Sequence, residues 1–130
     1  ACMNFIRRPD SFDVVVGSNL FGDILTDIGA IITGSMGLAA SGNINPDRTF
    51  PSTFEPVHGS APDIAGQNIA NPTALMLGAA MMLEYLERNE DAERMRKAIR
   101  FVVGEGKVTT PDLGGKASTS EFTDEVIRNL

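Results

Sequence analysis

The sequence has 130 residues, of which 42% are hydrophobic and 22% charged, and its formal net charge is −6 at pH 7. This length and composition are typical of a globular domain with a buried core, and they exclude the collagen-like and disordered classes. The acidic balance, together with the lack of a lysine and arginine cluster, argues against nucleic acid or an anionic membrane as a partner.

A single cysteine, Cys2, permits neither an internal disulfide nor a metal site built from several cysteines, so we expect a cytoplasmic location. The longest apolar run, TALMLGAAMML, is shorter than the roughly 18 residues that a membrane-spanning helix needs. The chain opens with ACMNFIRR, without an initiator methionine and within an expected helix. We therefore expect a piece of a longer protein.

The N-terminal part predicts a helix, a strand and a second helix. The first helix covers residues 3–8 and stops before Pro9, because proline cannot continue a helix. The β-branched run at residues 12–19 predicts a short buried strand. Residues 22–34 carry apolar side chains at helical spacing on one broad face, namely Ile24, Leu25, Ile28, Ile31 and Ile32. A strand followed directly by a helix is typical of an α/β fold.

The middle of the chain predicts an irregular segment and then a core helix. Glycines and prolines interrupt short extended pieces over residues 35–54. Residues 72–88 form a nearly all-apolar helical stretch, with Asn71 as a suitable N-cap and Pro72 at the first helical position. We expect this helix to lie at the centre of the core.

Two more helices are predicted at the C-terminal end. Residues 91–106 describe an amphipathic surface helix that ends at a glycine. A capping box, STSE at residues 118–121, starts the last helix. We expect this helix to bury Phe122, Val126, Ile127 and Leu130.

Two carboxylates, Asp23 and Asp27, lie one turn apart on the helix predicted over residues 22–34. Three interpretations are open. The pair can form a solvated polar stripe, it can be favourable because it lies near a helix N-terminus, or it can supply oxygen ligands to a hard cation such as Mg²⁺ or Mn²⁺.

The stretch FEPVHGSAPDIAGQNIANP, residues 54–72, suits neither a helix nor a strand. Its His58 is the only histidine of the chain, and small residues follow it that let backbone N–H groups approach a ligand closely. The carboxylate of Asp63 is suited to bind the two hydroxyls of a ribose and would repel a 2′-phosphate. Alternatively, His58 caps a turn and Asp63 begins one.

Three stretches, residues 19–27, 54–72 and 111–122, resemble in order the signature stretches of the β-decarboxylating dehydrogenases, the isocitrate/isopropylmalate dehydrogenase family. The likeness covers the whole chain. The pieces N-I-N-P and F-P-S before the second stretch look closest to the tartrate/D-malate dehydrogenase branch. The 3-isopropylmalate dehydrogenases of leucine biosynthesis are the near neighbours and the alternative.

The resemblance implies an α/β, two-domain fold of the isocitrate/isopropylmalate dehydrogenase type, of which this chain would be the C-terminal part. Residues 1–33 would end the smaller, dimer-forming domain, and residues 34–130 would be the C-terminal half of the larger, NAD-binding domain. The apolar face of the helix at residues 23–32 would pack against its mate in a homodimer. The alternative is burial of that face inside the same chain.

The resemblance also implies NAD- and Mg²⁺- or Mn²⁺-dependent oxidative decarboxylation of a 2-hydroxy dicarboxylic acid. The catalytic lysine and tyrosine and the substrate-binding arginines would lie upstream, so we expect no catalytic residue in this segment and no turnover by the segment alone. A second possibility is a non-catalytic NAD-binding fragment or a regulatory subunit of the same family. Retention of both Asp23 and Asp27 favours the enzyme.

By the same resemblance, Asp23 and Asp27 match the metal ligands of the family, with a third aspartate supplied by the partner subunit. The adenosine end of NAD would be bound by His58 and Asn71 at the adenine and by Asp63 at the ribose hydroxyls. Asp112 would either contribute to this end or cap a turn.

Further cofactor contacts are implied along the loop. Glu55 would lie toward the nicotinamide ribose, and a close backbone approach is implied at Gly59, Ser60 and Ala61. The NADP-dependent isocitrate dehydrogenases tend to carry Lys-Tyr where this chain has Asp63-Ile64, so the resemblance favours NAD.

Overall fold

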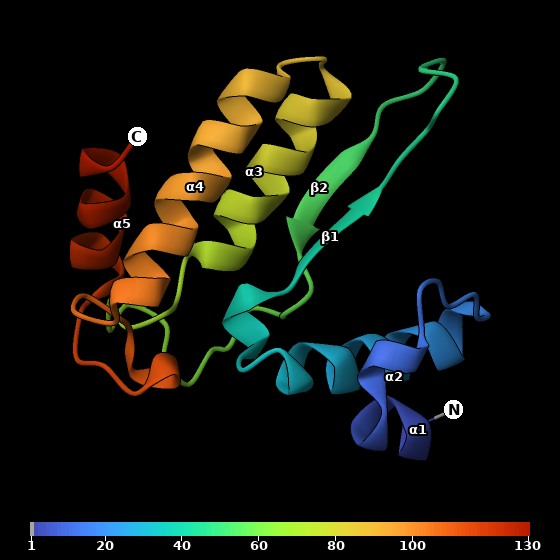
Figure 1. The fold of residues 1–130 in the computed structure, drawn as a ribbon, viewed down its shortest axis with the longest axis horizontal. Helices are drawn as coiled ribbons and strands as arrows, with labels where there is room; N and C mark the ends of the chain where they lie inside the picture. Colours follow the sequence, from blue (N-terminus) through green and yellow to red (C-terminus); the bar gives the residue numbers. More distant parts are fainter. Residues whose placement is uncertain (1) are drawn as a thin grey trace.

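The computed structural model describes residues 2–130 as a chain of helices with one small antiparallel sheet (Figure 1). Its helices and strands are α1 (Cys2–Arg7), α2 (Asn19–Ile32), β1 (Ala40–Asn43), β2 (Thr53–Pro56), α3 (Thr73–Tyr85), α4 (Asn89–Glu105) and α5 (Thr119–Arg128). Three short 3₁₀ turns connect them: η1 (Pro9–Ser11), η2 (Met36–Leu38) and η3 (Pro111–Leu113). No helix of the described part is long and apolar enough to cross a membrane.

The core lies between the C-terminal helices, with α4 between α3 and α5 (Figure 1). Because α4 is amphipathic, its apolar side chains gather on the side that α3 and α5 cover. The largest fully buried side chain is Phe122 of α5, with no exposed surface. The buried cluster consists of Ala98, Ile99, Val102, Phe122 and Val126.

The sheet is a hairpin that lies on the opposite side of α3 from α4 (Figure 1). Its two strands pair with Ala40 opposite Pro56 and Asn43 opposite Thr53. The end of α3 supports the hairpin, because Tyr85 packs against Phe54 with ring centroids 5.7 Å apart. The Tyr85 hydroxyl also donates a hydrogen bond of 2.9 Å to the Asn45 carbonyl.

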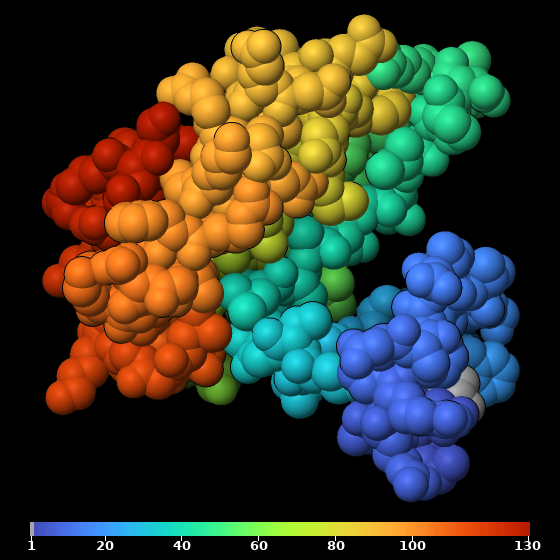
Figure 2. Space-filling model, in the orientation of Figure 1, coloured from blue at the N-terminus to red at the C-terminus, as the bar shows by residue number. Residues whose placement is uncertain are grey.

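The N-terminal part, α1 and α2, is set apart from the C-terminal helices (Figures 1 and 2). The helix predicted over residues 22–34 is confirmed as α2, which begins three residues earlier. Its apolar face is only partly covered, since Ile24 is 49% and Ile31 63% exposed, whereas Leu25 and Ile28 are half-buried. Among residues 2–130, this face is therefore only partly buried inside the same chain.

The strand predicted over residues 12–19 is wrong. Residues 14–18 have no regular structure, and Val14 and Val16 are 83% and 92% exposed. Valines favour a strand only where a neighbouring strand and a packed face receive them. No strand within residues 2–130 pairs with this run, because β1 and β2 pair only with each other.

The predicted helix ends are mostly confirmed. The core helix α3 begins at Thr73 with Pro72 as its N-cap, one residue later than predicted, and the Asn71 side chain accepts a 3.0 Å hydrogen bond from the Thr73 N–H. Helix α4 ends at Gly106, which adopts a left-handed conformation with φ 66°. The capping box of α5 is present between Ser118 and Glu121.

Two of the four residues expected to be buried by α5 are exposed. Phe122 and Val126 are buried, whereas Ile127 is 59% and Leu130 45% exposed. Helix α5 packs on α4 along a single stripe, and Phe122 and Val126 share that stripe because they are four residues apart. Ile127 is rotated by about 100° from Val126 and so lies off the contact.

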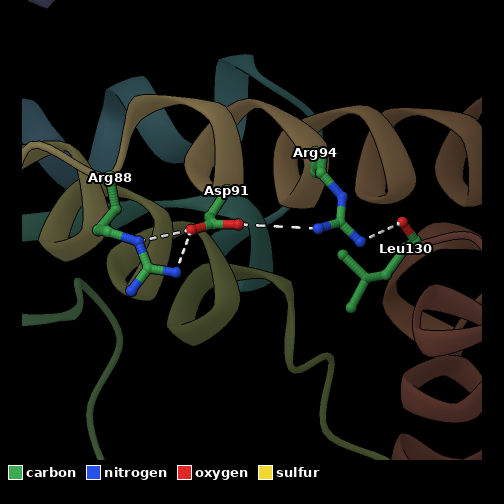
Figure 3. Close-up of polar contacts among 4 residues, drawn as sticks. All are labelled: Arg88, Asp91, Arg94 and Leu130. Carbon is green, nitrogen blue, oxygen red and sulfur yellow. Dashed lines mark hydrogen bonds and ion pairs between the residues drawn. The ribbon is translucent and has the colours of Figure 1, made fainter.

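A row of polar contacts runs from the start of α4 to Leu130, the last residue of the chain (Figure 3). Asp91 accepts a 2.7 Å hydrogen bond from the Arg88 Nε and lies 3.7 Å from Arg94. Arg94 in turn donates a 2.9 Å hydrogen bond to the Leu130 carbonyl. Exposed ion pairs contribute only about 0–1 kcal/mol each, so apolar burial dominates the stability of the junction of α4 and α5.

The variant Phe122→Ala should destabilise the protein by about 3–5 kcal/mol, because it removes a fully buried ring and leaves a cavity. Urea unfolding of the full-length protein measures this loss. Ile127→Ala on the same helix is the matched control, and its exposed side chain should cost less than about 1 kcal/mol. Equal losses in the two variants would contradict the described core.

Candidate functional site

A cavity of about 770 Å³ lies where three distant segments of the chain meet. Its walls are residues 35–37, most of the stretch at residues 58–71, and Pro111 with Asp112, together with Thr119. The volume and the largely apolar small-residue lining suit a flat organic ligand with a few polar groups. The predicted site residues that line it are His58, Gly59, Ser60, Ala61, Ile64, Asn71 and Asp112.

The loop that forms one wall is held in an unusual backbone conformation. Ala61 adopts a positive φ of 41° and Asn68 one of 56°, and an alanine in this region costs about 1–2 kcal/mol. The start of α5 fastens the loop, because the Thr119 N–H donates to the Asn68 carbonyl at 2.9 Å and the Ser120 hydroxyl donates to Asn68 Oδ1 at 3.1 Å. The start of α5 therefore holds this wall of the cavity in place.

Two of the predicted cofactor-binding residues, Asp63 and Glu55, lie outside the cavity lining. Asp63 is exposed between Ala61 and Ile64, which both line the cavity, and its carbonyl accepts a 2.8 Å hydrogen bond from Gln67. Glu55 lies on β2 with an exposed side chain that Asn43 approaches at 3.5 Å. His58 is exposed at the cavity, with its Nδ1 2.9 Å from the Gly59 carbonyl.

Asn71 and Asp112 meet at the base of the cavity, although they are 41 residues apart in the sequence. The Asn71 Nδ2 donates a 3.0 Å hydrogen bond to Asp112 Oδ2. The same oxygen accepts a hydrogen bond from the Ser35 hydroxyl, and Asp112 Oδ1 accepts one of 2.5 Å from Thr110. Asp112 thus binds other side chains and does more than cap its own turn.

The surroundings of Asp112 stabilise its charged form. Partial burial by itself would raise the pKa of the Asp112 carboxyl. The hydrogen bonds from Ser35, Thr110 and Asn71, and one from its own backbone amide, outweigh this effect and hold the pKa below its usual value of 3.8. The carboxylate is therefore charged throughout the neutral range.

Sequence reasoning missed Ser35 and Thr110. Both are nearly inaccessible, at 7% and 0% exposure, and both serve the same carboxylate. Ser35 follows Gly34 and precedes Gly37, so the small-residue turn GSMG was the one available signal. Nothing in the sequence relates Ser35 to Asp112, which lies 77 residues away.

The two carboxylates of α2 lie outside this cavity. Asp23 and Asp27 are both exposed on α2, one turn apart, and neither makes an ion pair within residues 2–130. The described residues contain no group of three His, Cys, Asp or Glu side chains that could hold a metal ion. Within this chain the pair can therefore supply two hard oxygen ligands and no more.

Comparison with known proteins places the chain in a family. The sequence profile described as isocitrate/isopropylmalate dehydrogenase matches residues 1–126. The chain belongs to this family. The D-malate dehydrogenase of Escherichia coli is 52% identical over 98% of this chain, and the isocitrate/homoisocitrate dehydrogenase of Thermus thermophilus is 56% identical over 98%.

A solved structure confirms the fold as part of an α/β dehydrogenase of this family. The crystal structure of isocitrate dehydrogenase from Methylococcus capsulatus superimposes with a TM-score of 0.93 at 42% identity and covers 98% of this chain. The chain spans 38% of that structure, 36% of the Escherichia coli relative and 37% of the Thermus relative. It therefore corresponds to little more than a third of these family members.

The variant Asp112→Asn should reduce the acid dependence of stability. Because the folded-state pKa of Asp112 is lowered, the carboxylate contributes stability above its unfolded value of 3.8, and this contribution is lost as the pH falls through the folded value. Urea unfolding between about pH 5 and pH 2 should show a shallower decline for the variant. Asp124→Asn, an exposed change on α5, should keep the wild-type slope, and identical slopes in all three proteins would contradict this account of Asp112.

Proposed function

We propose that these residues serve an NAD- and divalent-metal-dependent oxidative decarboxylation of a 2-hydroxy dicarboxylic acid, of the tartrate/D-malate type. The single observation that supports the proposal most is the cavity, in a chain of the isocitrate/isopropylmalate dehydrogenase family, that gathers His58, Asn71 and Asp112 around a small-residue loop. The E. coli relative at 52% identity is named D-malate dehydrogenase.

The donor set of the cavity fits the adenosine half of NAD. Ile64 and Ile69 offer apolar surface to a flat base, and the buried amide of Asn71 offers a polar edge. At Gly59 a side chain would meet no atom within 4 Å, so the loop leaves open space where a ligand can approach its backbone. Bound NAD would supply the hydride acceptor.

Asp63 lies at the rim, beside the residues that line the cavity, with its carboxylate exposed. In this position it can accept hydrogen bonds from the two hydroxyls of the adenosine ribose. A phosphate on the 2′-oxygen would meet it as a like charge, which favours NAD over NADP. Glu55, farther along on β2, is proposed to serve the nicotinamide ribose.

Asp23 and Asp27 fit a hard cation in their chemistry, since both are exposed carboxylates on one helix face. A bound Mg²⁺ or Mn²⁺ would supply Lewis-acid charge at the substrate oxygens. The two aspartates would hold it together with ligands from outside these residues, and we propose a partner subunit as one source. The chain's own part in the reaction is to bind and orient, because no proton-transfer residue is assigned to it.

We also propose that the chain contributes to two domains. Residues 1–33 would belong to a smaller, dimer-forming domain and residues 34–130 to a larger, NAD-binding domain. Support comes from α2, several of whose apolar side chains are exposed within this chain, whereas α3 to α5 enclose a core of their own. The uncovered face of α2 suits contact with the same helix of a second subunit in a homodimer.

The substrate within the family is tested by comparing turnover of the full-length protein. D-malate, tartrate, isocitrate, homoisocitrate and 3-isopropylmalate are offered separately with NAD⁺ and Mn²⁺, and NADH formation is measured. The highest kcat/KM with D-malate or tartrate supports the proposal. The isopropylmalate alternative has support of its own, because the 3-isopropylmalate dehydrogenase of Corynebacterium jeikeium is 49% identical over the entire chain. Turnover with none of the five would favour a non-catalytic, regulatory subunit.

The variants Asp23→Asn and Asp27→Asn should each raise the Mn²⁺ concentration needed for half-maximal activity by more than about 100-fold. Changes to outer-shell partners typically cost 10–100-fold in metal affinity, and a direct oxygen ligand should exceed this. Metal titrations of the full-length enzyme provide the measurement. Asp10→Asn is the control, since it removes an exposed carboxylate in η1. Wild-type metal dependence in both α2 variants would rule out this metal assignment.

The double variant Asp63→Lys/Ile64→Tyr should narrow the preference for NAD⁺ over NADP⁺ by about 10- to 100-fold, which corresponds to about 1.4–2.7 kcal/mol. The change replaces a carboxylate that repels a 2′-phosphate with an ammonium that attracts it. The ratio of kcat/KM for the two cofactors is the readout. A wild-type protein that uses NADP⁺ as well as NAD⁺ would refute the proposed role of Asp63.

A further inference from the structure

Asp112 joins three segments that are distant in the sequence. Its carboxylate accepts hydrogen bonds from Ser35, which follows α2, from Asn71, which precedes α3, and from Thr110, which precedes η3. These donors are buried, with exposures of 7%, 7% and 0%. Three donors from three segments on one carboxylate leave it little capacity to serve as a ligand-binding group itself.

The orientation of the Asn71 amide is fixed by two opposite demands. Its Oδ1 accepts from the Thr73 N–H at 3.0 Å, and its Nδ2 donates to Asp112 at 3.0 Å. A flipped amide would place a donor against the Thr73 N–H and an acceptor against the carboxylate, so only one orientation is compatible with both. The hydrogen bond to Asp112 uses one of the two amide hydrogens of Asn71, which also lines the cavity.

The turn at residues 35–38 is packed directly on this pair. The Gly37 N–H donates a 3.0 Å hydrogen bond to the Ser35 hydroxyl, which itself donates to Asp112. A side chain at Gly37 would lie 2.7 Å from the Asn71 Cβ and 3.0 Å from Asp112 Oδ2. The position thus requires glycine, and the turn cannot move without disturbing Asn71.

We propose that Asp112 is a positioning residue that holds the Asn71 amide and the turn at residues 35–38 together as a preformed wall of the cavity. This inference rests on the proposed function, because the ligand of the wall is the adenosine end of NAD. It also gives α2 a link to the cofactor site, since Ser35 lies three residues beyond the end of the helix that carries Asp23 and Asp27.

The test uses the full-length protein without metal or substrate and ADP-ribose as the probe. Calorimetry should show that Asp112→Asn and Ser35→Ala each weaken ADP-ribose binding by about tenfold, and that the double variant binds little worse than either single variant. Non-additivity is expected because both changes affect the same hydrogen bond, between Ser35 and Asp112. Asp124→Asn on the surface of α5 is the control and should bind like the wild type.

Hydrogen exchange without any ligand gives a second readout of the turn at residues 35–38. Hydrogen exchange of the Gly37 and Leu38 amides should be faster in both single variants, while the amides of the α4–α5 core keep their protection. In steady-state kinetics, KM for NAD⁺ should rise more than kcat falls.

The outcomes distinguish a failure of the positioning role of Asp112 from a failure of the proposed function. A wild-type protein that does not bind ADP-ribose overturns both this inference and the proposed function. Wild-type binding with unchanged affinity in Asp112→Asn overturns the inference alone. Loss of affinity in Asp112→Asn with none in Ser35→Ala, or additive losses, would make Asp112 a direct ligand and would also overturn the positioning role.

Discussion

The carboxylate of Asp112 is the interaction on which the arrangement of the cavity depends. Without its three donors, the turn after α2, the start of α3 and the η3 turn would have no shared polar contact. The buried hydroxyls and amide that it satisfies would each be costly to leave unpaired. One small charged group therefore determines how segments up to 77 residues apart meet.

The C-terminal helices support the cavity that Asp112 helps to form. Apolar burial between α4 and α5 fixes the start of α5, and the start of α5 in turn fastens the loop at Asn68 through Thr119 and Ser120. Ala61, which has a positive φ of 41°, lies in the same loop. The packed core thus supports one wall of the proposed cofactor site through the start of α5.

Helix α2 differs from the C-terminal helices in how little of its apolar surface this chain covers. Several of its apolar side chains are exposed in this chain, and its two aspartates do not form a group of three His, Cys, Asp or Glu side chains among residues 2–130. Both features suit a helix whose partners lie outside these residues, and family members about three times as long are known. Ser35 follows α2 and bonds to Asp112. Through this bond, the proposed metal-binding helix would be connected to the proposed cofactor site.

Local information in the sequence determined the helices and their ends. The caps at Gly106 and Ser118 were predictable because each depends on neighbours within a few residues. The loop at residues 54–72 was also recognisable, as an unbroken motif of the family. The tertiary structure alone decided that residues 14–18 form no strand, that Ile127 stays exposed and that Ser35 meets Asp112. These outcomes depend on pairing and burial between distant segments, for which a periodic pattern or a motif carries no information.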